Sequence, residues 1–359
     1  MLAITSHADT LNSVRPEAEL FIGLANAGVE MSVMTESDSP YADNMRAAGI
    51  EILDYDITKK LARRSVRALR QCFKAKRFDI VYAFNNKAIC NAAFAAIGLP
   101  LVLLTYRGQT GNISRSDPGA YLTHLHPRVD GIICVAKAVE VQLAKEVGSR
   151  KTLHTVYKGH DLSWYQDAPT TRSSIGLNDD QFVIGCVANN RPRKGVRYLL
   201  QACATLKDIP TLHLLLIGSD MDERTLGQQV AQLGMTARVS LLGRREDATA
   251  LIQCCDVAVL PAIRREGLPK SVIEAMVYAV APVVTDTVGY AELVEVGNSG
   301  LVVPPADASA LASALRRLHD DPEARASFAA AARERIHREF NVHQTVAGTL
   351  AVFQSHLQK

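Results

Sequence analysis

Two glutamates stand eight positions apart in the stretch REGLPKSVIE, with Glu266 in a Gly/Pro turn and Glu274 inside the helix expected to follow. Carboxylates accept hydrogen bonds from neighbouring hydroxyl groups, so one acid could hold a sugar and the other a ribose. The backbone N–H groups of the first helical turn, beside Lys270 and Ser271, suit a phosphate between them. The plainer alternative is that Glu266 favours the positive end of the helix dipole and Glu274 is solvated.

A second loop of the same half of the chain is basic. The segment NNRPRKG follows an apolar run and places Arg191, Arg193 and Lys194 between an expected strand and an expected helix. Cations in this position could meet a diphosphate, although each alone could belong to a solvated turn. One basic loop and one loop offering N–H groups and acids together favour a site for a nucleotide sugar.

The elements that must position these loops are apolar strands separated by segments of helical period. Strands that are apolar throughout, with helices between them, indicate parallel sheets covered on both faces. The fold class is therefore α/β, with two doubly wound, Rossmann-like domains whose ligands bind at the carboxyl ends of the strands. The expected strands are 2–5, 30–35, 51–55, 79–84, 101–106 and 131–136, then 182–188, 212–218, 239–243, 257–262, 281–286 and 300–304.

Bulk composition limits the class of protein. The chain has 359 residues, is 48% hydrophobic and carries a formal charge of +3, which fits roughly two globular domains and gives no overall preference for an acidic partner. The first residues lack a basic, apolar leader, so we expect a cytoplasmic protein, and no segment predicts a membrane span. Seven cysteines without a C-x-x-C pair indicate reduced, buried thiols.

The second half of the chain resembles a known family. EGLPKSVIEAM is similar to the E-x7-E signature of the retaining glycosyltransferases of family 4, and VANNRPRKG, LLLIGSD, VSLLGR, PVVTDTVGYAELV and GLVVPPAD follow in the family's order. The resemblance implies the GT-B fold of two facing domains. It implies an acceptor-binding domain over 1–163, a nucleotide-sugar-binding domain over 164–340, and a C-terminal helix over 341–359 that returns toward the first domain.

The resemblance also assigns roles to residues of the second half. It implies that Glu266 contacts the transferred sugar, that Glu274 binds the ribose, and that Arg191 and Lys194 hold the diphosphate. The catalytic set is thus Glu266, Arg191 and Lys194, without a cofactor or an obligatory metal ion. The expected donor-binding residues are Glu274, Gly267, Leu268, Pro269, Lys270, Ser271 and Gly243.

The first half departs from the family in its loops. The usual glycine-rich loop after the first strand is absent, and TYRGQTG stands where the family often has a histidine, which leaves Arg107 in that place. We expect His7, Arg15 and Arg107 as acceptor-side candidates. Surface or capping roles are the alternative for His7 and Arg15.

A basic segment in the first half suggests how an acceptor is reached. Residues 57–78 contain nine Lys or Arg and no acid, and the helical period places Arg63, Arg67, Arg70, Lys74 and Arg77 on one stripe beside an apolar stripe. Such a helix can rest on an anionic membrane surface, or its apolar stripe can simply pack on the sheet. No nucleic-acid recognition motif accompanies the charge.

The sequence therefore predicts a retaining, metal-independent hexosyltransferase of the cytoplasm or the cytoplasmic face of the inner membrane. It would move a sugar from a nucleotide sugar, a UDP-sugar before GDP-mannose, to a glycan or lipid-linked acceptor in envelope polysaccharide or lipopolysaccharide synthesis. The alternatives are a catalytically silent GT-B scaffold subunit of a membrane-associated assembly and a nucleotide-sugar epimerase of similar fold.

Overall fold

The computed structural model describes residues 1–7, 11–111, 113–148, 151–166, 168, 170–264, 267–287 and 289–358. These residues form two compact units. Unit 1 comprises Met1–Gly159 with Phe340–Lys359, and unit 2 comprises His160–Glu339. The chain therefore passes between the units twice, at 159/160 and at 339/340, whereas the sequence placed the domain limits at 163/164 and 340/341.

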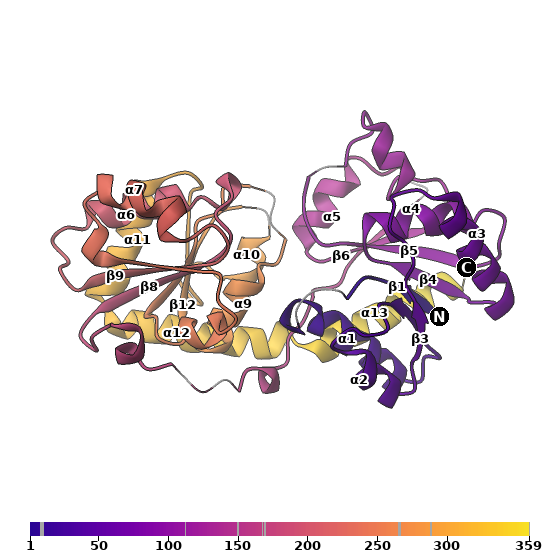
Figure 1. Cartoon of the computed structure of the whole chain (residues 1–359), viewed down its shortest axis with the longest axis horizontal. Coiled ribbons are helices and arrows are strands. Elements are labelled where there is room, and N and C mark those ends of the chain that lie inside the picture. The colour runs from indigo at the N-terminus through magenta and orange to yellow at the C-terminus, as the bar shows by residue number, and fades with distance from the viewer. Residues whose placement is uncertain are drawn as a thin grey trace. The chain divides into compact units, whose positions relative to one another are not determined.

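Unit 1 is a parallel sheet with the strand order β3-β2-β1-β4-β5-β6-β7. Helices α1, α2 and α13 cover one face, and α3, α4 and α5 cover the other (Figure 1). The strands are β1 Leu2–Ile4, β2 Ser32–Thr35, β3 Glu51–Asp54, β4 Ile80–Ala83, β5 Val102–Arg107, β6 Gly131–Cys134 and β7 Thr152–Thr155. The helices are α1 Leu11–Asn26, α2 Ala42–Ala47, α3 Arg63–Lys76, α4 Asn86–Ala95, α5 Lys137–Ala144 and α13 Val342–Leu357.

Unit 2 is a second parallel sheet, with the order β10-β9-β8-β11-β12-β13. Helices α6, α7 and α11 pack on one face, and α8 and α9 pack on the other. The strands are β8 Phe182–Val187, β9 Leu212–Ile217, β10 Val239–Gly243, β11 Val257–Leu260, β12 Ala281–Thr285 and β13 Leu301–Val303. The helices are α6 Val196–Thr205, α7 Glu223–Gln232, α8 Ala248–Ile252, α9 Lys270–Val277, α10 Tyr290–Leu293, α11 Ala308–Asp320 and α12 Pro322–Glu339.

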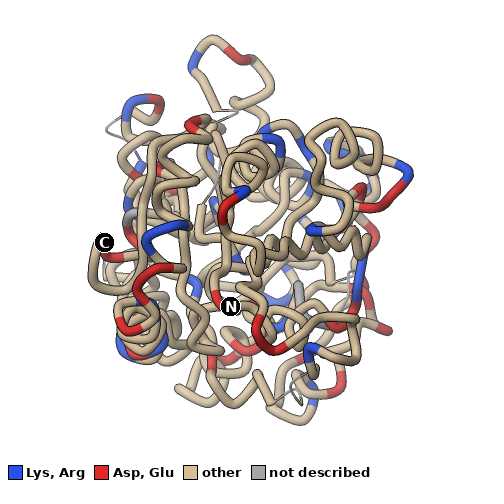
Figure 2. Tube along the Cα trace, turned by 90° about the vertical axis from the view of Figure 1, so that its left-hand side faces the viewer, with Lys and Arg blue, Asp and Glu red and all other residues tan. Residues whose placement is uncertain are grey.

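The twelve expected strands are confirmed, and β7 is a strand that the sequence did not predict. It lies at the edge of the sheet, and its residues, TLHT, include only one apolar side chain, so they lack the apolar run that marked the others. All seven cysteines are free thiols, and only Cys72 is not buried. Outside residues 57–78, Lys/Arg and Asp/Glu positions are interspersed along the chain (Figure 2).

Candidate functional site

The basic loop of unit 2 leaves the carboxyl end of β8 and leads into α6. Pro192–Lys194 form one 3₁₀ turn, and Gly195 then caps α6 with φ 70°. A Cβ at Gly195 would lie 1.9 Å from the carbonyl oxygen of Pro261, so both the left-handed backbone and the close approach require glycine here. Arg191 is exposed, while Arg193 and Lys194 are half-buried.

Backbone hydrogen bonds tie this loop to its neighbours at the same sheet edge. The N–H of Ile263, after β11, donates to Arg193 O at 2.8 Å, and the N–H of Asn190 donates to Ser219 O at 2.9 Å. After β9, the N–H of Gly218 donates to Gly243 O at 2.7 Å. The loops after β8, β9, β10 and β11 thus form one connected surface at the carboxyl edge, where a doubly wound sheet binds ligands.

Helix α9 opens at this edge after a proline. Pro269 directly precedes the first helical residue, Lys270. Among the described residues, no acceptor faces the N–H groups of Lys270 and Ser271. These donors and the positive end of the helix dipole can accept an anion.

Glu274 is not a solvated helical residue. It is 8% exposed, and its Oε1 accepts from Lys270 Nζ at 2.6 Å, one turn closer to the helix start. A buried carboxylate needs such a partner, because burying an unpaired charge is costly. The pair places an acid and a base of the expected donor set together.

The other acid, Glu266, lies outside the described residues, together with Arg265. The described part of that loop resumes at Gly267, which is buried, and Leu268, which is half-buried. A Cβ at Gly289, after β12, would lie 2.2 Å from Gly267 O, so the loop after β12 packs directly against this segment. Gly243 ends β10, and its N–H donates to Met221 O at 2.9 Å.

Two polar atoms at this edge were missed by the sequence reasoning. Asn189 Oδ1 follows β8 and Thr287 Oγ1 follows β12, and both are buried without a hydrogen-bond partner among the described residues. Buried polar atoms without partners are uncommon and call for an explanation. Because both residues directly follow a strand of this edge, the rule that selected Arg191 could have found them.

The acceptor-side candidates of unit 1 do not converge. His7 follows β1, is fully buried, and its Nε2 lies 3.5 Å from Glu17 Oε2. Arg15 lies on α1, and its charge influences Tyr41. Burial raises the pKa of Tyr41, and the charge of Arg15 partly opposes that shift. Arg107 is buried at the end of β5 and donates to Gly111 O.

The carboxyl edge of unit 1 instead holds a pocket of about 740 Å³, which the sequence reasoning did not identify. Aromatic residues at the ends of β3, β4 and β5 line it beside polar groups. The lining comprises Thr5, Ser6, Glu17, Glu36, Tyr55, Ile57, Thr58, Phe84, Asn85, Asn86, Lys87 and Tyr106. Half of these residues directly follow strands, so the carboxyl-edge rule applied to the first half would have selected those six.

A largely buried ion pair lies beside this pocket. Lys158 Nζ lies 3.0 Å from Glu17 Oε1 and 5.4 Å from the centre of the Tyr106 ring. Burial alone would raise the pKa of Glu17, but the charge of Lys158 and the neighbouring His7 ring outweigh it and bring the pKa to about 2. Burial would lower the pKa of Lys158, but Glu17 holds it above its ordinary value. Both groups are therefore ionised near neutral pH.

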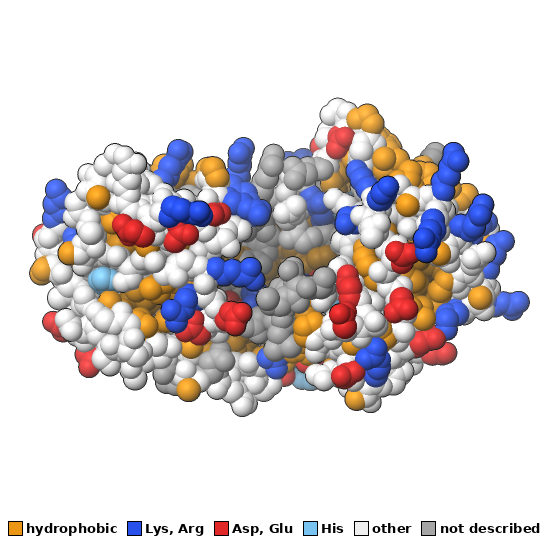
Figure 3. Space-filling model, in the orientation of Figure 1, with side chains coloured by type: hydrophobic (Ala, Val, Ile, Leu, Met, Phe, Trp, Pro, Cys, Tyr) orange, Lys and Arg blue, Asp and Glu red, His pale blue; other side chains and the backbone are white. Residues whose placement is uncertain are grey.

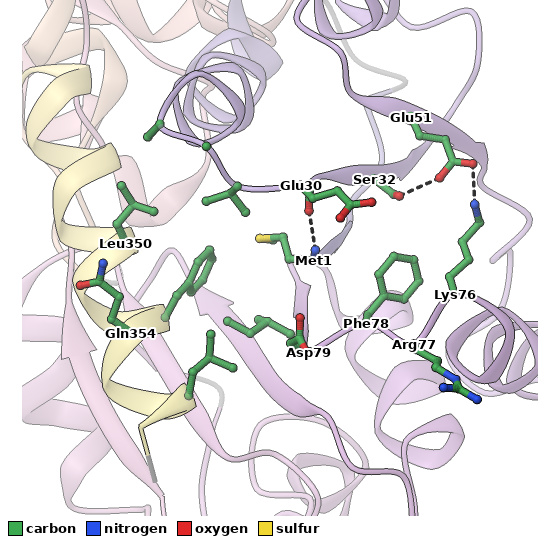
Figure 4. Close-up of a pocket in the computed structure, with 16 residues that line it drawn as sticks. Met1, Glu30, Ser32, Glu51, Lys76, Arg77, Phe78, Asp79, Leu350 and Gln354 are labelled. Carbon is green, nitrogen blue, oxygen red and sulfur yellow. Dashed lines mark hydrogen bonds and ion pairs between the residues drawn. The ribbon is translucent and has the colours of Figure 1, made fainter.

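A second pocket of unit 1, of about 440 Å³, opens at the amino edge of the same sheet (Figure 4). The Met1 ammonium donates to Glu30 O at 2.6 Å there. Glu51 accepts from Ser32 Oγ at 2.8 Å and from Lys76 Nζ at 2.5 Å. None of the predicted site residues lines this pocket, and it lies at the edge where doubly wound sheets do not bind their ligands.

The described part of the chain contains no cluster of three His, Cys, Asp or Glu side chains able to hold a metal ion. Within the same residues, every helix is too short or too polar to cross a bilayer.

Two family models match the chain side by side. The model described as Glycosyltransferase Family 4 matches residues 18–164, and the model described as Glycosyl transferases group 1 matches residues 167–335. Together they account for most of the sequence, and their limits lie close to the first passage of the chain between the two units.

Individual relatives share only modest sequence identity with the chain. A Bacillus subtilis (strain 168) protein, provisionally named as the glycosyltransferase EpsD, is 33% identical over 42% of this chain and 40% of its own length. The phosphatidyl-myo-inositol mannosyltransferase of Mycolicibacterium smegmatis (strain ATCC 700084 / mc(2)155) is 26% identical over 76% of this chain and 72% of its own length. The first of these matches therefore spans less than half of its relative.

Among solved structures, HepE (Alr3699) of Anabaena in complex with UDP-glucose matches with a TM-score of 0.79. The match covers 98% of this chain and 99% of HepE, at 22% sequence identity. A likeness at this identity establishes the shared fold of two Rossmann-like domains.

Proposed function

The chain belongs to the glycosyltransferases of group 1, family 4, with the GT-B fold, and from that premise we propose that it transfers a hexose-type sugar from a nucleotide sugar to a glycan or lipid-linked acceptor. The observation that carries the proposal is the carboxyl edge of unit 2. There a basic loop, the N–H groups at the start of α9 and the buried Glu274 all lie at one sheet edge.

Each of these groups has a chemical task in the proposed reaction. Transfer from a nucleotide sugar requires stabilisation of the charge that develops on the departing diphosphate. Arg191, Lys194 and the N–H groups of Lys270 and Ser271 supply positive charge and donors for it. Glu274 is the proposed ribose acceptor, and Glu266 the proposed contact to the transferred sugar.

We propose that Gly267, Leu268, Pro269 and Gly243 shape the donor site rather than contribute charge. Retention of the anomeric configuration is expected from the family, through a front-face attack on a short-lived oxocarbenium-like species. Arg191, Lys194 and the α9 donors would carry out charge stabilisation without an obligatory metal ion.

A UDP-sugar is the first choice of donor, and GDP-mannose the second. HepE, which shares the fold, was solved with UDP-glucose, and this supports UDP as the first nucleotide to test. The acceptor belongs on unit 1, where the pocket of about 740 Å³ opens at the carboxyl edge, and this pocket replaces His7, Arg15 and Arg107 as the centre of the proposed acceptor site.

A lipid-linked acceptor of envelope polysaccharide or lipopolysaccharide synthesis fits the outer surface of unit 1. Lys and Arg side chains gather there over α3 (Figure 3). Those of Arg63, Arg67, Lys74 and Arg77 are exposed, whereas Leu69 and Phe73 are buried against the unit. The name of the relative from Mycolicibacterium smegmatis includes a phospholipid, phosphatidyl-myo-inositol. We therefore propose a peripheral site at the cytoplasmic face of the membrane.

The proposal is tested by Glu266→Ala, assayed for sugar transfer and, separately, for nucleotide binding. Loss of turnover with retained nucleotide binding is the expected result for an enzyme. Full cellular function of this variant would instead identify a catalytically silent scaffold.

A further inference from the structure

The pocket at the carboxyl edge of unit 1 combines an aromatic floor with a polar rim. Phe84 and Tyr106, at the ends of β4 and β5, stack with ring centres 5.2 Å apart and planes at 27°. Both rings are half-buried, so each keeps surface toward the pocket. On the rim, Tyr55 OH donates to Asn85 Oδ1 at 3.3 Å, and Asn86 is exposed at the start of α4.

Glu36 is the fixed charge of this rim. Its Oε1 accepts from Ser6 Oγ at 2.6 Å, and its Oε2 accepts from the N–H of His7 at 2.7 Å and from Thr35 Oγ1 at 3.2 Å. Burial raises the pKa of Glu36, but these hydrogen bonds outweigh it, so the net shift is downward. A carboxylate has about four acceptor positions, which leaves about one for a ligand hydroxyl.

The other charges around the pocket set its preference. Glu17 is neutralised by Lys158, and Lys87 is exposed on the first turn of α4, where solvent and salt screen it. Glu36, in contrast, is held in place by three donors and cannot turn away from a ligand. A second anionic group brought into the pocket therefore meets a like charge, whereas a hydroxyl finds an acceptor.

We infer that this pocket binds an uncharged hexopyranose ring of the acceptor. Its apolar C–H face lies on the Phe84–Tyr106 pair, and one hydroxyl donates to Glu36. A pocket of aromatic side chains with a few fixed polar groups suits such a ligand, which is apolar on its faces and polar at its edge. The inference rests on the proposed function and narrows its acceptor to a neutral sugar, excluding uronate and phosphorylated sugars.

Matched ligand pairs test the charge preference. Methyl glucoside, galactoside and mannoside are each compared with the corresponding methyl uronide, which differs only in a carboxylate at C6, by ligand-observed NMR titration of the full chain. We expect at least one neutral glycoside to bind about tenfold more tightly than its uronide. Binding of no neutral glycoside, or equal binding of both members of each pair, would overturn the inference.

Variants assign the preference to Glu36. Glu36→Gln keeps an acceptor oxygen and removes the charge, so the preference should fall toward equality, whereas a purely structural role would weaken both ligands alike and leave the ratio unchanged. Glu51→Gln, at the amino edge of the same sheet, also removes a carboxylate bonded to a serine and should leave the ratio unaltered. If Glu36→Gln does not fold, Asn86→Asp adds a charge at an exposed rim position, and at low salt, where screening is weak, it should increase the ratio.

A nucleotide titration of the same samples separates this inference from the proposed function. If the chain binds a nucleotide but prefers no neutral glycoside, the inference about the pocket is wrong and the proposed donor site stands. If the chain binds neutral glycosides through Glu36 but binds no nucleotide, the inference about the pocket stands and the proposed transfer from a nucleotide sugar is wrong.

Discussion

At the scale of single residues, Glu274 combines burial with a charged partner. If it binds the ribose, Glu274→Gln should weaken UDP binding by about tenfold to a hundredfold, the usual effect of losing a hydrogen bond to a charged group. Inorganic pyrophosphate, which has no ribose, should bind the variant as well as it binds the wild type. Isothermal titration with both ligands measures the two effects. An equal loss of affinity for both ligands would show that Glu274 stabilises α9 and does not bind the ribose.

The Glu17–Lys158 pair gives a prediction about stability. Removing one partner leaves the other charge buried, so Lys158→Met should lower the free energy of unfolding by about 3 kcal/mol at pH 7. The double variant Glu17→Gln/Lys158→Met should recover most of the loss. Urea denaturation of the three proteins checks this. A double variant no more stable than Lys158→Met would show that the pair itself is not the cause.

The same pair sets a pH dependence. The folded-state pKa of Glu17 is about 2, below its ordinary 4.5, so its contribution of about 3 kcal/mol is present above pH 4.5 and is lost as the pH falls toward 2. The pKa of Lys158 is raised, so its contribution is present below 10.5 and is lost only above that value. Below pH 4.5 the unfolding free energy of the wild type should therefore fall more steeply than that of the double variant, which lacks the carboxylate. A constant difference across that range would contradict the prediction.

At the scale of elements, the loops of unit 2 depend on close backbone contacts. Gly195 and Gly234 both have positive φ, but a Cβ at Gly234 meets nothing within 4 Å, whereas one at Gly195 meets Pro261 O. Gly234→Ala should cost about 1 kcal/mol of stability and leave nucleotide binding intact. Gly195→Ala should cost more and weaken nucleotide binding, because Lys194 moves with the loop. Equal effects of the two variants on binding would refute this role of the contact.

Helix α3 gives a prediction about membranes. Replacing Arg63, Arg67 and Lys74 by Gln should lower binding to vesicles rich in anionic lipid, since each basic residue near such a surface contributes about 1 kcal/mol. The control replaces Lys207, Arg224 and Arg333 of unit 2, which are also exposed. Vesicle sedimentation at two salt concentrations measures the difference. Equal binding of both triple variants would remove α3 from the membrane proposal.

The elements also show what the sequence can and cannot specify. Apolar runs predicted the central strands because both faces of a parallel sheet are buried, and they missed β7 because its residues, TLHT, include only one apolar side chain. Helical period placed Arg70 on the basic stripe of α3, but its guanidinium donates to Ala95 O and Ile97 O at the end of α4. Period alone does not reveal which long side chain reaches a neighbouring helix end.

The candidate site also has a part that the sequence predicted and a part that it did not. The family motifs selected the loops of unit 2, where a phosphate site needs fixed residue types at fixed spacing. No such motif marked the pocket of unit 1, because Glu36, Phe84 and Tyr106 come from three strands separated by long helical connections. Only the strand order brings them to one edge.

At the scale of the whole molecule, each unit has its own carboxyl edge with its own chemistry. Unit 2 offers cations and backbone donors, and unit 1 offers aromatic rings and a fixed carboxylate. Two sheets with different ligand preferences in one chain match a reaction that joins a charged donor to a sugar acceptor. The central claim is that unit 2 binds the donor nucleotide.

A thermal-shift series tests that claim most directly. The full chain, Lys194→Ala and the exposed control Lys207→Ala are heated with UDP-, GDP-, ADP-, dTDP- and CMP-sugars. A ligand at a hundred times its Kd stabilises the folded state by about 2.7 kcal/mol. We predict a rise in Tm with one nucleotide, absent in Lys194→Ala and retained in Lys207→Ala. No rise with any nucleotide, or an equal rise in Lys194→Ala, would contradict the account.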